Sequence, residues 1–179
     1  MPLVEEFLPH YTYEDYKHWE GRWELIKGIP YAMSPSPNFI HQKISSKIAR
    51  ILEEELDNCP HYHALISFDY KISEDTVLQP DNLVICYEPE NYNYLTRPPE
   101  LIIEILSSST IKKDLNLKYD IYEKEGVKYY VVVFPEEKKV KIFQLINKKY
   151  QLIGEFKDKI FEFKLTKCKI QFDFSRIWG

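Results

Sequence analysis

The sequence predicts an α/β fold, in which a mixed sheet is flanked by helices and followed by a β-rich C-terminal meander. Three observations support this prediction. The runs LIIEIL and KYYVVVF are rich in branched or aromatic residues, as expected for strands that are buried on both faces. The segment between these runs has the 3.6-residue period of a helix and ends at Gly126. Near the C-terminus, KYQLIGEF, KIFEFKL and KIQFDF alternate with the period of two that is typical of strands.

The N-terminal third contains signals for two helices and a strand. Thr12 followed by Asp15 predicts an N-cap before a short helix over YEDYKHW. WELIKGIPYAM predicts a β segment with a turn at Gly28, and SPSPN ends that segment. Asn38 can cap a helix that runs to about Asn58. One side of this helix carries the apolar stripe Ile40, Ile44, Ile48, Ile51 and Leu52.

The central part alternates strands with one helix. Residues 62–72 have a β-like pattern, LVICY is a short apolar run, and LIIEIL follows as a third strand. Ser107 to Thr110 form a polar cap for the helix that ends before Gly126. KYYVVVF and VKIFQL are expected to pair across PEEKK. We therefore expect one mixed sheet within a single domain over residues 1–179.

Composition indicates an ordered globular protein. The 179 residues are 44% hydrophobic and 29% charged, and only 5 are Gly. No apolar run approaches the ~20 residues needed to span a bilayer, and the acidic N-terminus lacks the layout of a signal peptide. We therefore expect a cytoplasmic protein without a membrane partner. The three cysteines are odd in number and far apart, so we expect no disulfide framework.

The charge is unevenly distributed. The net charge of −4 argues against a protein that coats nucleic acid non-specifically. Residues 138–169 nevertheless hold ten Lys against three acids, which gives +7 and leaves −11 to the rest of the chain. A basic sheet could follow a phosphate backbone, whereas lysines on edge strands could simply prevent aggregation.

Several common sites are missing from the sequence. No GxSxG elbow surrounds the serines of SSST, and no phosphate-binding or dinucleotide glycine motif is present. CPHYH lacks a usual zinc-ligand spacing and a second pair of ligands.

Two acids stand beside or within the predicted core strands. Asp81 precedes LVICY, and Glu104 is in the middle of LIIEIL. A carboxylate in an apolar strand is costly unless it is paired, hydrogen-bonded or bound to a metal. If the two strands are adjacent, Asp81 and Glu104 lie side by side.

One lysine falls on the apolar side of the helix that follows. At 100° per residue, Lys118 shares a side with Ile111, Leu115 and Tyr122. Its position suggests an active-site contact, but a snorkelling side chain or a structural ion pair would produce the same pattern. Two carboxylates and an amine suit metal-assisted phosphodiester cleavage with Mg²⁺ or Mn²⁺. The lysine could then orient the attacking water or stabilise the developing charge.

These residues resemble the PD-(D/E)xK nuclease superfamily and, more closely, the bacterial Uma family of restriction-endonuclease-like proteins. The resemblance covers residues 11–145 and leaves 146–179 as a β extension. It rests on six segments in order: YTYEDY, WELIKG, MSPSPNFIHQKI, QPDNLVI, PELIIEILSSST and the Lys118 helix with EKEGVKYYVVV. It implies a restriction-endonuclease-like fold.

The family pattern is carried over residue by residue. Asp81 matches the motif aspartate and Glu104 the second acid, so the resemblance implies that both hold Mg²⁺ or Mn²⁺. Leu106 stands where the superfamily has its lysine, and Lys118 fits a position to which that lysine has migrated. Glu24 matches a recurrent glutamate that could be a further metal or water contact.

Three further positions complete the comparison with the family. His41 matches a family position without an assigned role. Ser108 and Phe134 depart from the Pro and Asp that the family often has there.

The resemblance implies an Mg²⁺-dependent endonuclease that acts on nucleic acid as a homodimer. Its catalytic residues would be Asp81, Glu104, Lys118 and Glu24. We expect DNA as the substrate, with RNA as an alternative, because no feature of the sequence separates deoxyribose from ribose. The alternative is a non-catalytic descendant of the fold that binds nucleic acid or a protein.

Overall fold

The computed structural model describes residues 7–33, 38–107 and 113–179. The chain divides into two compact units, each built from segments that are separate in the sequence. Unit 1 comprises residues 1–36, 69–79 and 89–97, and unit 2 comprises residues 37–68, 80–88 and 98–179. Whether these units fold together as the expected single domain stays a prediction. None of the described helices is long and apolar enough to cross a membrane.

Unit 1 contains a short helix and an antiparallel sheet in the order β2-β1-β5-β4. The element bounds are α1 Tyr13–Tyr16, β1 Trp23–Ile26, β2 Ile29–Ala32, β4 Tyr70–Ser73 and β5 Thr76–Leu78. Lys27 and Gly28 join β1 to β2 with φ values of 50° and 78°, the left-handed conformation that two-residue hairpin turns require. The predicted cap is confirmed, since the Asp15 carboxylate accepts the N–H of Thr12 at 2.9 Å.

Unit 2 contains a six-stranded sheet in the order β10-β9-β8-β7-β6-β3 and a two-stranded sheet, β11-β12. Its strands are β3 His63–Ile66, β6 Asn82–Ile85, β7 Leu101–Ile105, β8 Tyr129–Phe134, β9 Lys139–Ile146, β10 Lys149–Phe156, β11 Ile160–Lys164 and β12 Lys169–Asp173. Its helices are α2 Phe39–Leu56, the π-helical turn η2 Lys113–Lys118, α3 Tyr119–Glu125 and the 3₁₀ turn η3 Phe174–Ile177.

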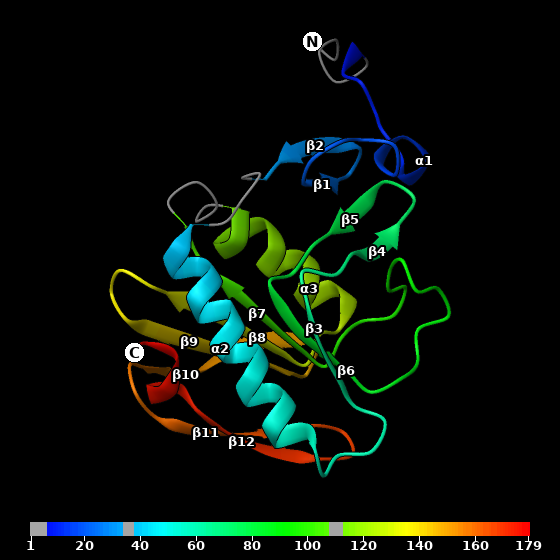
Figure 1. The fold of residues 1–179 in the computed structure, drawn as a ribbon. Coiled ribbons are helices and arrows are strands. Elements are labelled where there is room, and N and C mark those ends of the chain that lie inside the picture. The colour runs from blue at the N-terminus through cyan, green and yellow to red at the C-terminus, as the bar shows by residue number, and fades with distance from the viewer. Residues whose placement is uncertain (1–6, 34–37, 108–112) are drawn as a thin grey trace. The chain divides into compact units, whose positions relative to one another are not determined.

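The six-stranded sheet is mixed, as predicted. β7 and β8 are parallel, with Glu104 opposite Val132, and the remaining pairs are antiparallel. Figure 1 shows α2 crossing one face of this sheet and α3 lying behind it. Leu101, Ile103 and Ile105 pack into the core on the α2 side. Because strand side chains alternate between faces, Glu104 points to the α3 side.

The expectation of one sheet is wrong, because the described residues form three. The β-like stretch 62–72 divides between β3 in unit 2 and β4 in unit 1. Ser67 interrupts it with a φ of 46°, and its N–H donates to the Asp81 carbonyl at 3.0 Å. Side-chain period alone cannot reveal such a break, because the residues on either side keep a strand pattern.

The apolar stripe of α2 is confirmed for four of its five members, which are buried: Ile44, Ile48, Ile51 and Leu52. Ile40 is 49% exposed and lines a pocket, because the first turn of α2 extends beyond the packed core. Asn38 caps this helix, accepting the N–H of His41 at 2.8 Å. The proposed cap over residues 108–110 lies outside the described residues.

The expectation of no disulfide is also wrong. A disulfide joins Cys59, just after α2, to Cys168, just before β12, with their Cα atoms 5.8 Å apart. The two cysteines are 109 residues apart in the sequence but are brought together because α2 packs against β12. Spacing along the chain therefore gave no guide to this pair.

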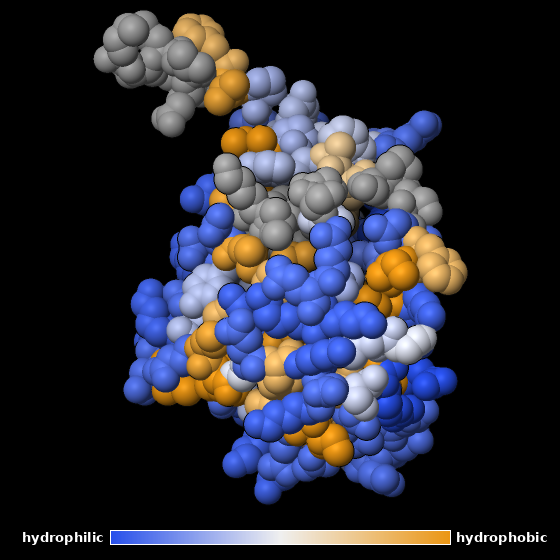
Figure 2. Space-filling view, turned by 90° about the vertical axis from the view of Figure 1, so that its left-hand side faces the viewer, coloured by the Kyte–Doolittle hydropathy of each residue, from blue (hydrophilic) through white to orange (hydrophobic). Residues whose placement is uncertain are grey.

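The lysines of the basic segment lie on β9 to β12 and their turns. Lys139 pairs with Glu137 at 2.7 Å and lies 3.7 Å from Glu155, and Lys149 pairs with Glu123 at 3.0 Å. These ion pairs reduce the positive charge available to a phosphate backbone. They favour the alternative in which the lysines prevent aggregation of the strands. Figure 2 shows a side of the molecule on which hydrophilic residues predominate, with hydrophobic residues between them.

Candidate active site

Asp81 directly precedes β6 and Glu104 lies on the neighbouring strand β7, both in unit 2, which confirms the predicted adjacency. β6 and β7 are antiparallel with Asn82 opposite Ile103, so the next positions along the ladder are Asp81 and Glu104. The N–H of Ile105 donates to Asp81 Oδ2 at 2.7 Å. Both acids are buried, with exposed fractions of 5% and 2%.

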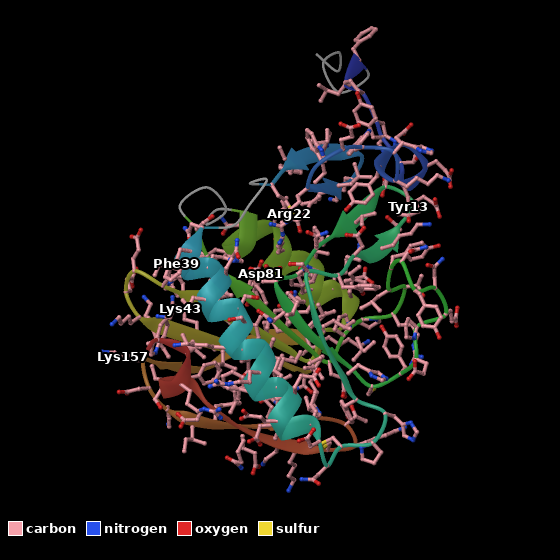
Figure 3. The ribbon with its side chains drawn as sticks, in the orientation of Figure 1. Tyr13, Arg22, Phe39, Lys43, Asp81 and Lys157 are labelled. Atoms are coloured by element: carbon pink, nitrogen blue, oxygen red, sulfur yellow. A yellow bond between two sulfur atoms is a disulfide. The ribbon has the colours of Figure 1, made fainter. Side chains whose placement is uncertain are left out.

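Helix α2 is attached to β6 by a buried polar pair. Ser45 Oγ donates to Asn82 Oδ1 at 2.9 Å, and Asn82 Nδ2 donates to the Ser45 carbonyl at 3.1 Å. His41 lies one helical turn before Ser45, and Asp81 lies one residue before Asn82. The two hydrogen bonds between Ser45 and Asn82 therefore bring the His41 imidazole against the Asp81 carboxylate, with Nε2 3.1 Å from Oδ1 (Figure 3 labels Asp81).

The two ring nitrogens of His41 differ in their surroundings, because Nε2 faces Asp81 and Nδ1 does not. Its Nδ1 is buried and, within the described part of the chain, has no hydrogen-bond partner. His41 also lines a cavity of about 560 Å³ in unit 2, whose other walls include Leu106, Phe134 and Trp178. An imidazole in this position can orient Asp81 on one side and present a second polar atom on the other.

Glu104 is held by two side chains that follow β7. Lys118 Nζ donates to Glu104 Oε1 at 3.0 Å, and Tyr122 Oη donates to the same oxygen at 2.9 Å. Lys118 is 2% exposed and Tyr122 is fully buried, as the helical period predicts. The helix itself differs from the expectation, because Lys118 ends a π-helical turn before α3 begins. Such turns are frequent at functional sites.

The charges around Asp81 favour its ionised form. Burial raises the pKa of this carboxyl, but the hydrogen bond with His41, the charges of His41 and Lys118 and the N–H of Ile105 outweigh that effect and lower it. A carboxylate that stays ionised while buried can accept a cation without first losing a proton. Asp81 therefore has the electrostatics of a metal ligand.

The residues present fit a hard divalent cation, although they form a small ligand set. Asp81 and Glu104 offer carboxylate oxygens, which Mg²⁺ and Mn²⁺ prefer. No group of three or more His, Cys, Asp or Glu side chains that could hold a metal occurs among the described residues. A cation bound here would keep waters or substrate oxygens as further ligands, as Mg²⁺ commonly does.

Glu24 belongs to unit 1, where it is fully buried on β1. Its Oε2 accepts the N–H of Gln79 at 2.8 Å. The structure thus brings Asp81, Glu104 and Lys118 together within unit 2. Glu24 belongs to unit 1 and has its contacts there.

Sequence reasoning missed Tyr122, which contacts Glu104, and Asn82, which attaches α2 to the sheet beside Asp81. Tyr122 was placed on the apolar stripe without a role, although a buried tyrosine hydroxyl usually needs a hydrogen-bond partner. It lies four residues after Lys118 on the same helix face, and this spacing is the signal that could have found it. Asn82 follows Asp81 directly, but its contact with Ser45 depends on the packing of α2 and leaves no local signal.

Comparisons with known proteins show the family and the fold of the chain. Residues 10–160 match the family model described as "Uma2: Putative restriction endonuclease". The fold is similar to that of a solved protein described as "a putative nuclease belonging to DUF820 from Anabaena variabilis ATCC 29413", with a TM-score of 0.76 and 15% identity. This similarity covers 93% of the present chain and 97% of the other. No curated protein matches the chain.

Proposed function

The chain belongs to the Uma2 family of restriction-endonuclease-like proteins, and from this premise we propose that it is a metal-dependent endonuclease that hydrolyses phosphodiester bonds in DNA. One observation carries the proposal. Two buried carboxylates lie at neighbouring positions, Asp81 directly before β6 and Glu104 on β7, with the buried amine of Lys118 against Glu104. Burying three ionisable groups is costly, and a structural role needs only a single pair.

Each residue has a role in the proposed reaction. Asp81 and Glu104 would hold Mg²⁺ or Mn²⁺, which when bound polarises a phosphoryl oxygen and lowers the pKa of a coordinated water. His41 orients Asp81 through the 3.1 Å contact, and Tyr122 with Lys118 orients Glu104. The Lys118 ammonium donates hydrogen bonds toward the water or the developing negative charge of the phosphate.

Glu24 completes the proposed catalytic residues as an acid that assists with the metal or the water. Its hydrogen bond from Gln79 fixes one carboxylate oxygen, so the side chain has a defined orientation in unit 1. The proposal also includes action in the cytoplasm as a homodimer, because two copies of one active site can cut both strands of a duplex.

The proposal is tested by two measurements on the same set of variants. Nicking of supercoiled plasmid DNA is measured with Mg²⁺, with Mn²⁺ and with EDTA, and Mn²⁺ binding is measured by calorimetry without DNA. The variants are Asp81→Asn, Glu104→Gln and Lys118→Met. Glu123→Gln is the matched control, because Glu123 is a unit 2 acid outside the proposed site and its partner Lys149 is exposed.

We expect the native chain and the Glu123 variant to nick DNA and to bind Mn²⁺. Asp81→Asn and Glu104→Gln should lose both properties, and Lys118→Met should lose nicking by a factor of about 10² or more while still binding Mn²⁺. A native chain that binds DNA but neither nicks it nor binds Mn²⁺ would refute the proposal and support the non-catalytic alternative.

A further inference from the structure

A second polar network, in unit 1, is centred on Gln79. The backbone N–H of Gln79 donates to Glu24 Oε2 at 2.8 Å. Its side-chain Oε1 accepts two bonds from Arg22, at 3.2 Å from Nε and 3.1 Å from Nη2. Its Nε2 donates to Asp69 Oδ1 at 3.0 Å, and Tyr16 Oη donates to the same oxygen at 3.1 Å. Gln79 thus contacts Glu24, Arg22 and Asp69 together.

The guanidinium of Arg22 has an unusual partner. Two N–H groups of an arginine often bond to the two oxygens of a carboxylate, but those of Arg22 both bond to the single amide oxygen of Gln79. Among the residues that the structure describes, no carboxylate oxygen lies within 4.0 Å of its nitrogens. Arg22 is therefore oriented by the protein while its positive charge is not neutralised by a contacting acid.

The surroundings of Arg22 leave room for a ligand. It lines a cavity of about 520 Å³ in unit 1, whose other walls include Tyr13, Trp19, Trp23 and Asp69. Figure 3 labels Arg22 and Tyr13. Lys17, the other long cation at this cavity, is already paired with Glu14. The guanidinium has five N–H donors, of which Gln79 takes two, so donors remain for an anion in the cavity.

Arg22 is also close to a proposed catalytic residue. It precedes Glu24 by two positions, and residues two apart along an extended chain point to the same side about 7 Å apart. Both contact Gln79, so one residue sets the position of the acid and of the cation. If Glu24 contacts the substrate as proposed, Arg22 lies beside the same part of the phosphate backbone.

We propose that Arg22 binds a non-bridging phosphate oxygen of the DNA backbone, and that Gln79 positions it for this contact. The inference rests on the proposed function, because it takes the substrate to be a phosphodiester. It adds a substrate-binding residue to that function. A neutral amide suits this task, because it holds the guanidinium without cancelling the charge that attracts phosphate.

The test measures DNA binding under conditions in which no cleavage occurs. Fluorescence anisotropy of a fluorescein-labelled duplex is followed in EDTA at several KCl concentrations, for the native chain, Arg22→Gln and Arg22→Lys. Lys17→Gln is the matched control, because it removes one positive charge from the same cavity. Circular dichroism melting confirms that each variant is folded, and competition with inorganic phosphate separates a site for free phosphate from one for the DNA backbone.

We expect Arg22→Gln to weaken binding about tenfold and to reduce the slope of log K against log salt by about one, the loss of one phosphate contact. Arg22→Lys should keep most of the slope but bind less tightly, and Lys17→Gln should change little. An unchanged slope in a folded Arg22→Gln would overturn the inference, as would equal losses in both glutamine variants or displacement of the duplex by millimolar phosphate.

These outcomes separate the inference from the proposed function. A native chain that nicks DNA although Arg22→Gln keeps the native salt slope would sink the inference alone. A native chain that binds the duplex through Arg22 but does not nick it would sink the catalytic proposal alone.

Discussion

The buried pair of Glu104 and Lys118 allows a prediction whose size follows from the structure. Both side chains are 2% exposed, and Nζ lies 3.0 Å from Oε1. In Lys118→Met the chain keeps a similar shape but the carboxylate loses its cation and stays buried. Breaking a buried ion pair costs about 3–5 kcal/mol. Because Tyr122 still donates to Glu104 at 2.9 Å, we expect the lower end of this range, about 3 kcal/mol.

The prediction is checked by urea denaturation in EDTA, followed by circular dichroism. For a protein of this length, a loss of about 3 kcal/mol corresponds to a fall in Tm of roughly 6–12 °C. Lys124→Met is the control, because Lys124 is exposed on the same helix and its replacement should change the free energy of unfolding by less than about 0.5 kcal/mol.

The double variant Glu104→Gln/Lys118→Met distinguishes the charge from the packing. The amide of Gln can still accept from Tyr122, and no charge remains at position 104 without its cation. We expect it to recover about 2 kcal/mol relative to Lys118→Met. A loss below about 1 kcal/mol in Lys118→Met, or a double variant that is less stable than Lys118→Met, would refute the reasoning that the cation offsets the burial of Glu104.

Three further predictions concern other parts of the chain. Burial raises the pKa of Asp69, so its ionisation lowers the stability of the folded chain at neutral pH. Asp69→Asn keeps an oxygen that can accept from Tyr16, and it should raise the free energy of unfolding at pH 7 but not at pH 3. An equal gain at both pH values would contradict this prediction. Reducing the disulfide between Cys59 and Cys168 should lower the free energy of unfolding by about 2–4 kcal/mol, measured by urea denaturation with and without dithiothreitol. A Cys59→Ser variant that is as stable as the native chain without dithiothreitol would contradict this prediction. Asn38→Ala should remove the cap of α2 at a cost of about 1 kcal/mol in the same assay, and no loss would show that this cap contributes nothing.

Local patterns were enough for most elements and for the main acids. The caps at Thr12 and Asn38 were predicted because capping depends on residues within one turn. Glu104 was recognised because a charge inside an apolar strand must have a compensating partner. Lys118 followed from the helical period, even though its turn proved to be π-helical, since one turn of either helix keeps it on the buried side.

Contacts between distant segments were decided only by the folded chain. The Asp81 contact with His41 depends on how α2 lies on the sheet, and no spacing between residues 41 and 81 encodes that packing. The bond of Cys59 with Cys168 has the same origin, because two elements 109 residues apart must first pack together.

The α/β class, the helix caps and the acids of the candidate site could be predicted from the sequence, since each follows from the properties of a few neighbouring residues. Tertiary structure alone decided that the strands divide among three sheets and that Gln79 links Glu24 to Arg22. The physical reason is that side-chain period selects strand or helix, whereas strand partners and side-chain hydrogen bonds depend on which surfaces the whole chain can bury together.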